Sequence, residues 1–344
     1  MPENTYKKYN LSLVENPIPD ALIRMTMPMI FGMAMLFAFG LVDTLFISFL
    51  GTGPLTAISF TFPVTFTIIS LAIGLGIGTS AVVARCLGRG DYATAKEAST
   101  VTNYVAVLLS VILSLLTFIF MDRIFLLMGA SEQMLTPIRE YMVYWLPGSN
   151  LMVAMMTGNS ILRACGDTRT PSIIMAGSGL LNIVLDPILI FGFGPIPAMG
   201  IGGAAIATVI SWLLGFLCLF YLLAFRLNLI NKTLPRWPVM YRSGREMLRI
   251  GLPAAGANMM TPIAAGIMTA IAAGFGESVV AAFGVGSRIE PFATLIVLAM
   301  STTLPPLISQ NFGARRLDRV VEAYRISTRF IMLWQMFVYL ILVA

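Results

Sequence analysis

The sequence predicts an all-α, polytopic membrane protein built from a duplicated unit. Hydrophobic residues make up 58% of the chain, charged residues 11%, and the mean hydropathy is +0.87, which is far from the composition of a soluble domain. The apolar runs are long and unbroken, whereas the strands of a membrane barrel alternate apolar and polar residues. Three pairs of residues lie 225 positions apart at matching places: Arg24 and Arg249, Pro28 and Pro253, and Gly88 and Gly313. Matching apolar runs lie between these marks, so the repeated unit consists of whole membrane segments.

Nine apolar segments are long enough to cross a membrane as helices, which takes about 20 residues each. Six of them precede a polar link: 22–48, 55–84, 100–121, 138–162, 171–193 and 201–225. Three follow it: 247–273, 279–310 and 326–344. Because six spans is an even number, both copies of the repeat are expected the same way up, related by a pseudo-twofold axis along the membrane normal.

Two six-helix lobes are therefore expected, joined by the polar link. Residues 1–230 would form the first lobe, and residues 231–344 a partial second lobe of about three helices. Since the second copy stops inside its third span, we expect a longer gene product of about 450 residues. Two facing lobes leave a cleft open to one side, which is the geometry of an alternating-access carrier.

The basic residues predict the orientation. With the N-terminus inside, 19 of the 22 Lys and Arg residues fall on one side, and the exceptions are Arg123, Arg139 and Arg288. The positive-inside rule then gives a multi-pass protein of the inner (plasma) membrane with a cytoplasmic N-terminus. Residues 1–21 are polar, so we expect no cleavable signal. The net charge of +6 is a topology signal and does not indicate nucleic-acid binding.

The residue types present argue against an enzyme. The chain has no histidine, and no GxSxG, Walker or CxxC motif, so the common catalytic and metal-binding patterns are missing. Cys86, Cys165 and Cys218 lie far apart, without metal-ligand spacing. We therefore expect no resident cofactor.

Carboxylates at membrane depth are the strongest functional candidates, because each costs about 2.5 to 3.5 kcal/mol at the centre of a span. Asp43 lies in the outer half of the first span, beyond Pro28, which favours a bend. Asp186 follows Asn182 by four residues, so both side chains lie on one helix face. The alternatives are a helix-end acid for Asp43, a buried clasp between helices for Asp186, and the start of the embedded helix for Pro28.

Three further residues extend this set. Asn159 in the fourth span and Thr208 in the sixth could complete the polar cluster, although a helical threonine also bonds to its own backbone. Glu290, near the start of the eighth span, is either half of an ion pair or a functional group of the second lobe. The counterpart of Asp43 in the second copy is Met268, so proton or cation binding is expected in the first lobe. The 23 methionines are either filler or a plastic substrate lining.

Several stretches resemble the multidrug and toxic compound extrusion (MATE) family: Pro28–Asp43 followed by Leu50–Thr52, Leu162–Thr168, and Leu181–Pro187. Glu290 with Gln310–Ala314 looks like the DinF-like branch, and the seventh span lacks the acidic residue typical of the NorM-like branch. The resemblance covers essentially the whole chain. It implies a twelve-helix, two-lobe antiporter that exports organic cations and amphipathic compounds against a proton or sodium gradient.

The resemblance also implies the roles of individual residues. The coupling-ion site would consist of Asp43, Asn159, Asn182, Asp186 and Thr208, with Pro28 as the bend in the first span. Sodium, if it is the coupling ion, would bind at Asp43, Asn182, Asp186 and Thr208.

The expected mechanism is alternating access in a monomer that contacts the lipid bilayer and small-molecule drugs or organic cations. Protonation of Asp43 or Asp186 removes a charge, the first span bends at Pro28, and the substrate leaves to the outside. One alternative is a lipid-linked glycan flippase of the same superfamily, which needs several basic residues in the cleft, where only Arg288 is placed. The other is a membrane scaffold or sensor whose polar cluster is structural.

Overall fold

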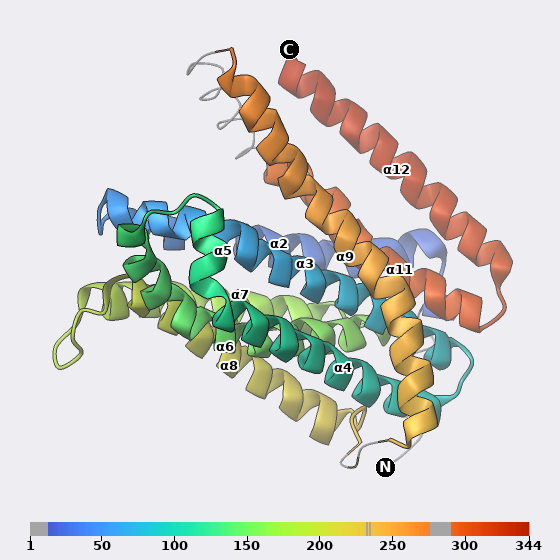
Figure 1. Cartoon of the computed structure of the whole chain (residues 1–344). Coiled ribbons are helices and arrows are strands. Elements are labelled where there is room, and N and C mark those ends of the chain that lie inside the picture. The colour runs from blue at the N-terminus through green and yellow to red at the C-terminus, as the bar shows by residue number, and fades with distance from the viewer. Residues whose placement is uncertain (1–12, 232, 234, 276–289, 344) are drawn as a thin grey trace.

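The computed structural model describes residues 13–231, 233, 235–275 and 290–343, and these residues form helices and connecting turns without a strand (Figure 1). The helices are α2 (Ile18–Ser48), α3 (Thr52–Gly88), α4 (Tyr92–Ile119), α5 (Met121–Leu127), α6 (Glu132–Ala164), α7 (Arg169–Phe191), α8 (Gly200–Tyr221) with the π-helical turn η1 (Leu222–Arg226), α9 (Trp237–Ala273), α11 (Leu295–Gly313) and α12 (Leu317–Val343). The predicted all-α membrane fold is confirmed.

Six of the described helices are long and apolar enough to cross a membrane: α2, α3, α4, α7, α8 continued by η1, and α11. The other long helices, α6, α9 and α12, coincide with predicted spans but carry more polar and charged residues. Much of the polarity of α6 is compatible with membrane depth because this helix packs against α3, α4 and α8. The short helix α5 was not predicted as a separate element.

The outer surfaces of the helices are apolar. On α4, for example, Leu108, Ile112, Leu115 and Ile119 recur at helical spacing and are 46% to 62% exposed. A contiguous apolar face of this kind is unfavourable in water, and it is the surface that a helix presents to lipid. The chain is therefore a multi-pass membrane protein.

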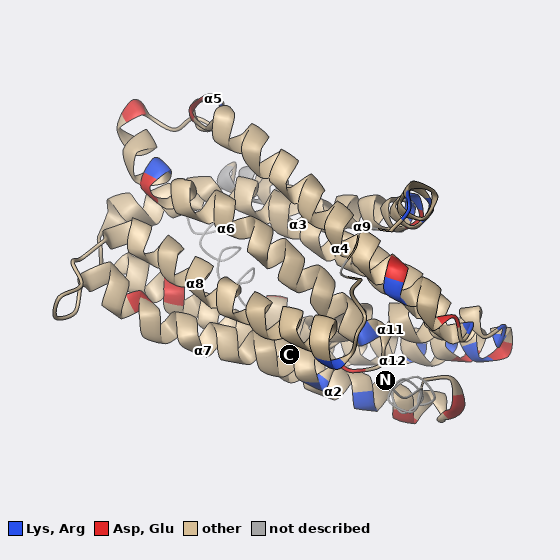
Figure 2. Ribbon diagram, turned by 90° about the horizontal axis from the view of Figure 1, so that it is seen from below, with Lys and Arg blue, Asp and Glu red and all other residues tan. Residues whose placement is uncertain are grey.

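Charged residues gather at one end of the bundle, where α2, α4, α7, α9 and α12 begin and α3, α6, α8 and α11 end (Figure 2). We call this the basic end. At this end α4 begins after Asp91, whose Oδ1 accepts a hydrogen bond of 3.0 Å from the Thr94 backbone N–H. The hydrogen bonds from Thr94 hold the pKa of Asp91 below its usual range, and the cap stabilises the first turn.

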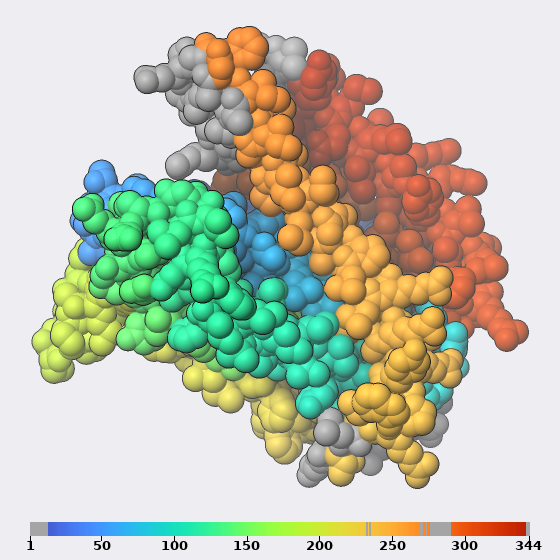
Figure 3. All heavy atoms as spheres, viewed as in Figure 1, coloured from blue at the N-terminus to red at the C-terminus, as the bar shows by residue number. Residues whose placement is uncertain are grey.

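Helix α9, the first helix of the second copy of the repeat, packs along α3 of the first copy and also contacts α4 (Figure 3). The approach to α3 is close because glycines line it. A Cβ added to Gly74 would meet the carbonyl oxygen of Gly251, and one added to Gly78 would meet that of Met247. The boundary between lobes at residues 230 and 231 stays a prediction.

The two copies of the repeat meet at the basic end through equivalent contacts. A Cβ on Gly88 would overlap the carbonyl oxygen of Gln310, and a Cβ on Gly313 would overlap that of Arg85. Gly88 and Gly313 are repeat partners, as are Arg85 and Gln310, so the two contacts are related by the internal symmetry. We call the contact of Arg85–Gly88 with Gln310–Gly313 the seam.

The same symmetry continues deeper in the bundle. Thr26 on α2 and Thr303 on α11 share a hydrogen bond of 3.0 Å between their hydroxyls. The repeat partners of these residues, Gly251 and Gly78, also face each other, because a Cβ on Gly78 would lie 3.2 Å from the Gly251 nitrogen. The predicted internal duplication is thus visible as paired contacts between the two copies.

Candidate coupling site

Helices α2 and α7 run in the same direction and lie side by side. Gly32 lies against Ser172, and Gly179 lies under the ring of Phe39; the residue numbers in both pairs differ by 140. The Ser172 hydroxyl also donates to the Met29 sulfur at 3.6 Å, a pair that differs by 143. Residues that differ by 140 to 143 therefore lie at the same level on the two helices, which brings Asp43 on α2 level with Asp186 on α7, since those two residues differ by 143.

Helix α8 runs in the opposite direction along the other side of α7. It is held close where Gly203 contacts the backbone of Leu189, and where the Met199 N–H donates to the Leu189 carbonyl at 2.9 Å. Because the two helices are antiparallel, residues after Gly203 on α8 lie beside residues before Leu189 on α7. Thr208 therefore lies opposite Asn182. Three helices therefore present polar side chains to one point.

Hydrogen bonds connect the side chains from α7 and α8. The Asn182 amide donates to Asp186 Oδ1 at 3.0 Å and, at a longer 3.4 Å, to the Thr208 hydroxyl. The Thr208 hydroxyl in turn donates to the Ala204 carbonyl at 3.0 Å. Asn182 thus orients one oxygen of Asp186 and leaves the other free to face α2.

Asp43 and Asp186 complete the site from opposite sides. Asp186 is 0% exposed and Asp43 is partly buried, and the two carboxyl groups lie within electrostatic range of each other. Asp43 Oδ1 and Asp186 Oδ2 are buried and have no hydrogen-bond donor among the described residues. Like charges so placed repel each other strongly in a medium of low dielectric constant, so this pair favours a bound proton or cation.

Tyr141 on α6 is a site residue that the sequence reasoning missed. Its side chain is 9% exposed and lies within electrostatic range of both Asp43 and Asp186. A single tyrosine in an apolar span gives no signal beyond the general expectation that a buried hydroxyl finds a polar neighbour.

The structure does not bring Asn159 into this cluster. On α6, Gly148 lies against Val209, the neighbour of Thr208, whereas Gly158 lies against Leu219. Asn159 is eleven residues beyond Gly148, which corresponds to about 16 Å along a helix, toward the basic end. Its side chain is 2% exposed and its Oδ1 has no partner among the described residues. Any role of Asn159 in coupling stays a prediction.

No hydrogen bond or ion pair among the described residues joins the remaining candidates to the cluster. Pro28 is inside α2, which passes through it as one continuous helix. The Glu290 side chain is exposed, and it makes no hydrogen bond or ion pair with another described residue. Arg288, on which the flippase alternative depended, lies outside the described residues.

The arrangement fits reversible binding of a small cation. Two carboxylates, an amide and a hydroxyl offer oxygen ligands from three helices, and such oxygens accept a proton or a hard metal ion. Because Asp43 belongs to a different helix from Asp186, an ion held by both carboxylates would link α2 to α7. The same geometry offers neither a nucleophile paired with a base nor a phosphate-binding loop.

Comparison with known proteins identifies the family. The MatE family profile matches residues 28–188 and 253–344. An FAD transporter of Shewanella oneidensis is 40% identical over 328 residues, covering 95% of this chain and 73% of that protein. The multidrug export protein MepA of Staphylococcus aureus is 28% identical, covering 91% of this chain and 69% of its own length.

A solved structure shows the same architecture. The crystal structure of an aspartate-to-asparagine mutant of the Vibrio cholerae MATE transporter VcmN is similar with a TM-score of 0.88 and 32% sequence identity. The match covers 97% of this chain and 74% of that one. The profile match, the curated relatives and this structure agree: the chain belongs to the MATE family of membrane transporters.

Proposed function

We propose that this chain is a cation-coupled antiporter that exports organic molecules by alternating access. The observation that carries the proposal is the pair of electrostatically coupled carboxyl groups of Asp43 and Asp186, each with one buried oxygen that has no hydrogen-bond donor among the described residues. A proton or a sodium ion between them removes the repulsion. The energy of an ion gradient can therefore enter the protein at this point.

Ion binding is coupled to transport through α2. Loading the Asp43 and Asp186 pair changes how firmly α2 packs on α7, and Pro28 gives α2 a place to bend because it leaves one carbonyl of the helix without a partner. A bend there would move Asp43 and reshape the space next to it. Ion and substrate then compete through the conformational equilibrium even where they do not touch.

We further propose that the basic end faces the cytoplasm and that the protein is monomeric in the inner membrane. The support is the gathering of Lys and Arg at that end (Figure 2), as the positive-inside rule requires. Under this orientation the candidate coupling site lies in the outer half of the membrane, since Asp43 is five residues from the end of α2 at Ser48.

Two classes of substrate are supported by different observations. Organic cations and amphipathic drugs are supported by the likeness to MepA, a multidrug export protein, at 28% identity. FAD is the second candidate, supported by the higher identity of 40% to a protein named an FAD transporter. The two substrates differ in charge, so one assay can separate them.

The test is exchange in proteoliposomes that contain the full-length protein. Vesicles are loaded with protons or with sodium ions, and FAD or ethidium, as an organic cation, is added on the opposite side. We expect one of these substrates to accelerate release of the loaded cation, and the more effective one identifies the substrate class. Opposing proton and sodium gradients then identify the coupling ion. If neither substrate accelerates release of either ion, the polar cluster is structural and the proposal is wrong.

A further inference from the structure

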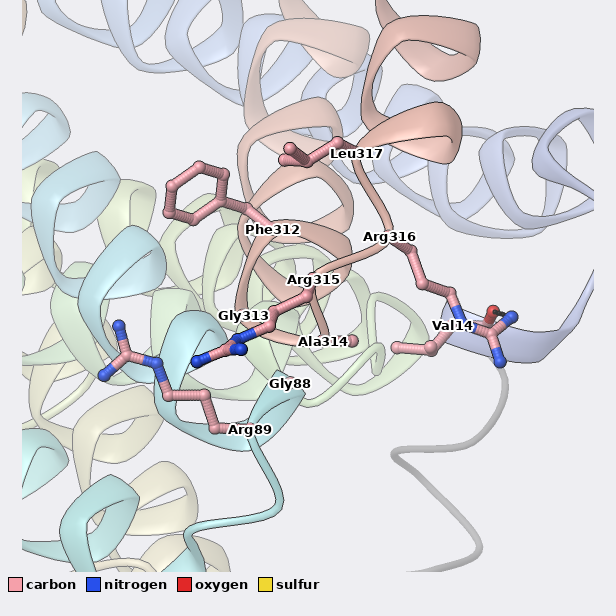
Figure 4. A pocket seen from close by; sticks show the side chains of 9 residues that line it. All are labelled: Val14, Gly88, Arg89, Phe312, Gly313, Ala314, Arg315, Arg316 and Leu317. Atoms are coloured by element: carbon pink, nitrogen blue, oxygen red, sulfur yellow. Dashed lines mark hydrogen bonds between the residues drawn. The ribbon is translucent and has the colours of Figure 1, made fainter.

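A cavity of about 860 Å³ lies at the basic end, beside the seam (Figure 4). It is separate from the coupling site. Its lining combines apolar side chains (Val14, Phe312 and Leu317), the glycines and alanine of the two turns (Gly88, Gly313 and Ala314), and three arginines (Arg89, Arg315 and Arg316). Among the described residues, no acidic side chain lines it. Three cations around one cavity repel each other unless an anion binds between them.

The arginines come from both copies of the repeat. Arg89 follows α3, and Arg315 and Arg316 lie in the turn between α11 and α12. Figure 4 shows Arg89 and Arg315 directed to the same side of the cavity, while Arg316 reaches toward Val14, whose carbonyl it contacts at 3.2 Å. Among the described residues, the side chains of Arg89 and Arg315 make no hydrogen bond or salt bridge. Their donors are therefore available to a ligand.

Of the acidic residues near the cavity, Asp91 and Glu246 are engaged elsewhere, while Glu15 and Asp318 adjoin lining residues in the chain without lining the cavity themselves. Asp91 caps α4 through Thr94, although it is near enough to Arg89 for a weak electrostatic attraction. Glu246 pairs with Arg85 at 3.9 Å and with Arg242 at 3.6 Å. The cavity therefore keeps its positive character.

The backbone of Arg315 gives a second, independent indication. Its φ is +60°, a left-handed conformation that a residue with a side chain adopts at a cost in strain. The repeat partner of Arg315 is Gly90, which has a φ of +75° and is free of that cost. The second copy thus holds an arginine where the first copy has the residue best suited to the turn. Strain that is kept at one position points to a function of the side chain.

We propose that this cavity binds a phosphoryl group, as a phosphodiester or a pyrophosphate, through Arg89 and Arg315. Guanidinium groups match the oxygens of phosphate in geometry and charge, and the apolar lining suits the remainder of an amphipathic molecule. A ligand held by both copies bridges the seam. It should therefore stabilise the state in which the seam is closed. This inference does not depend on the coupling mechanism proposed above.

The test compares binding to the full-length protein and to two variants. Native mass spectrometry measures binding of phosphatidylglycerol against phosphatidylcholine, and calorimetry measures binding of inorganic pyrophosphate. Arg89→Gln removes the cation from the first copy. Arg315→Gly removes it from the second copy and also relieves the backbone strain, so its thermal stability should equal or exceed that of the wild type. We expect each variant to bind at least about tenfold more weakly, as the loss of a charged hydrogen bond implies.

The control is Arg226→Gln, which removes the same charge from an exposed position at the basic end that does not line the cavity. It should bind like the wild type. Selective binding of phosphatidylglycerol identifies a lipid headgroup as the ligand, and binding of pyrophosphate identifies a soluble one. The proposal is overturned if neither probe binds, or if Arg226→Gln weakens binding as much as the two cavity variants.

Discussion

Replacing Gly88 with alanine should open the seam between the two copies of the repeat. The added Cβ would overlap the carbonyl oxygen of Gln310 and lie 2.8 Å and 2.9 Å from its C and Cα atoms. All three are backbone atoms, which cannot rotate away as a side chain can. Since carbon atoms in contact are normally about 3.5 to 4.0 Å apart, α3 and α11 must separate by roughly 1 Å.

The cost of that separation sets the size of the effect. Overpacking of a well-packed contact costs about 1 to 3 kcal/mol, and a difference of that size changes a conformational ratio by about 5-fold to 150-fold. Gly313→Ala should act in the same way, because its Cβ would overlap the carbonyl oxygen of Arg85. The double variant should lose less stability than the sum of the losses of the two single variants, since either added Cβ forces the same contact apart.

Alkylation of Cys86 is the assay. This cysteine lies within the seam segment, is free and is half-buried, and Cys165→Ser with Cys218→Ser makes it the single reporter. Gly88→Ala should accelerate its alkylation by about fivefold or more. Gly177→Ala is the matched control, because its Cβ would meet nothing within 4 Å and alanine favours the helix by up to about 1 kcal/mol. Equal alkylation rates and melting temperatures in Gly88→Ala and the wild type would refute the packing argument.

Three further predictions test separate parts of the account. Pro28→Ala should leave thermal stability nearly unchanged, because α2 is already continuous there, but should slow transport; unchanged transport rates would remove the hinge. Thr208→Val keeps the side-chain shape and removes the acceptor of the 3.4 Å bond from Asn182, so it should weaken ion binding measured by calorimetry by less than about tenfold; a complete loss would mean that Thr208 is a main ligand. Asp91→Ala should lower stability by about 1 kcal/mol at neutral pH. Because Thr94 lowers the folded-state pKa of Asp91, this contribution is present above the unfolded pKa of about 3.9 and is lost as pH falls through the folded value, so a difference in melting temperature that persists at pH 2 would contradict it.

The spans and the burial of two carboxylates within them could be predicted from the sequence because both depend on local rules. Long apolar runs mark helices that meet lipid, and a buried acid such as Asp43 is costly enough to indicate a use. The pairing of Asn182 with Asp186 followed from helical spacing. All of these features are properties of one helix at a time.

What the sequence could not give is the relative depth of neighbouring helices. Asn159 and Thr208 both lie in spans, but packing of Gly148 on Val209 and of Gly158 on Leu219 places them at different levels. The register of α2 against α7 likewise depends on contacts such as Phe39 with Gly179. Helical periodicity predicts which face a residue occupies, whereas the level at which two faces meet is a result of tertiary packing.

The contact between the two copies of the repeat also could not be predicted from the sequence. Gly88 and Gly313 were recognised as marks of the duplication, yet their sequence spacing does not show that they lie at the contact between the two copies. That contact brings Arg89 close to Arg315, and so creates the basic cavity. The short helix α5 was missed because its apolar residues continue the preceding span.

The most direct test of cation coupling at Asp43 and Asp186 is substrate-stimulated ion release from proteoliposomes, measured for Asp43→Asn, Asp186→Asn and the double variant. An amide has the shape of the protonated acid but cannot release a proton, so each single variant should fold and lose coupled release. The double variant should be little worse than either single one, because the two carboxylates act as one site. Asp20→Asn, which changes an exposed acid at the start of α2, should behave like the wild type. Normal ion release by Asp43→Asn or by Asp186→Asn would contradict the account.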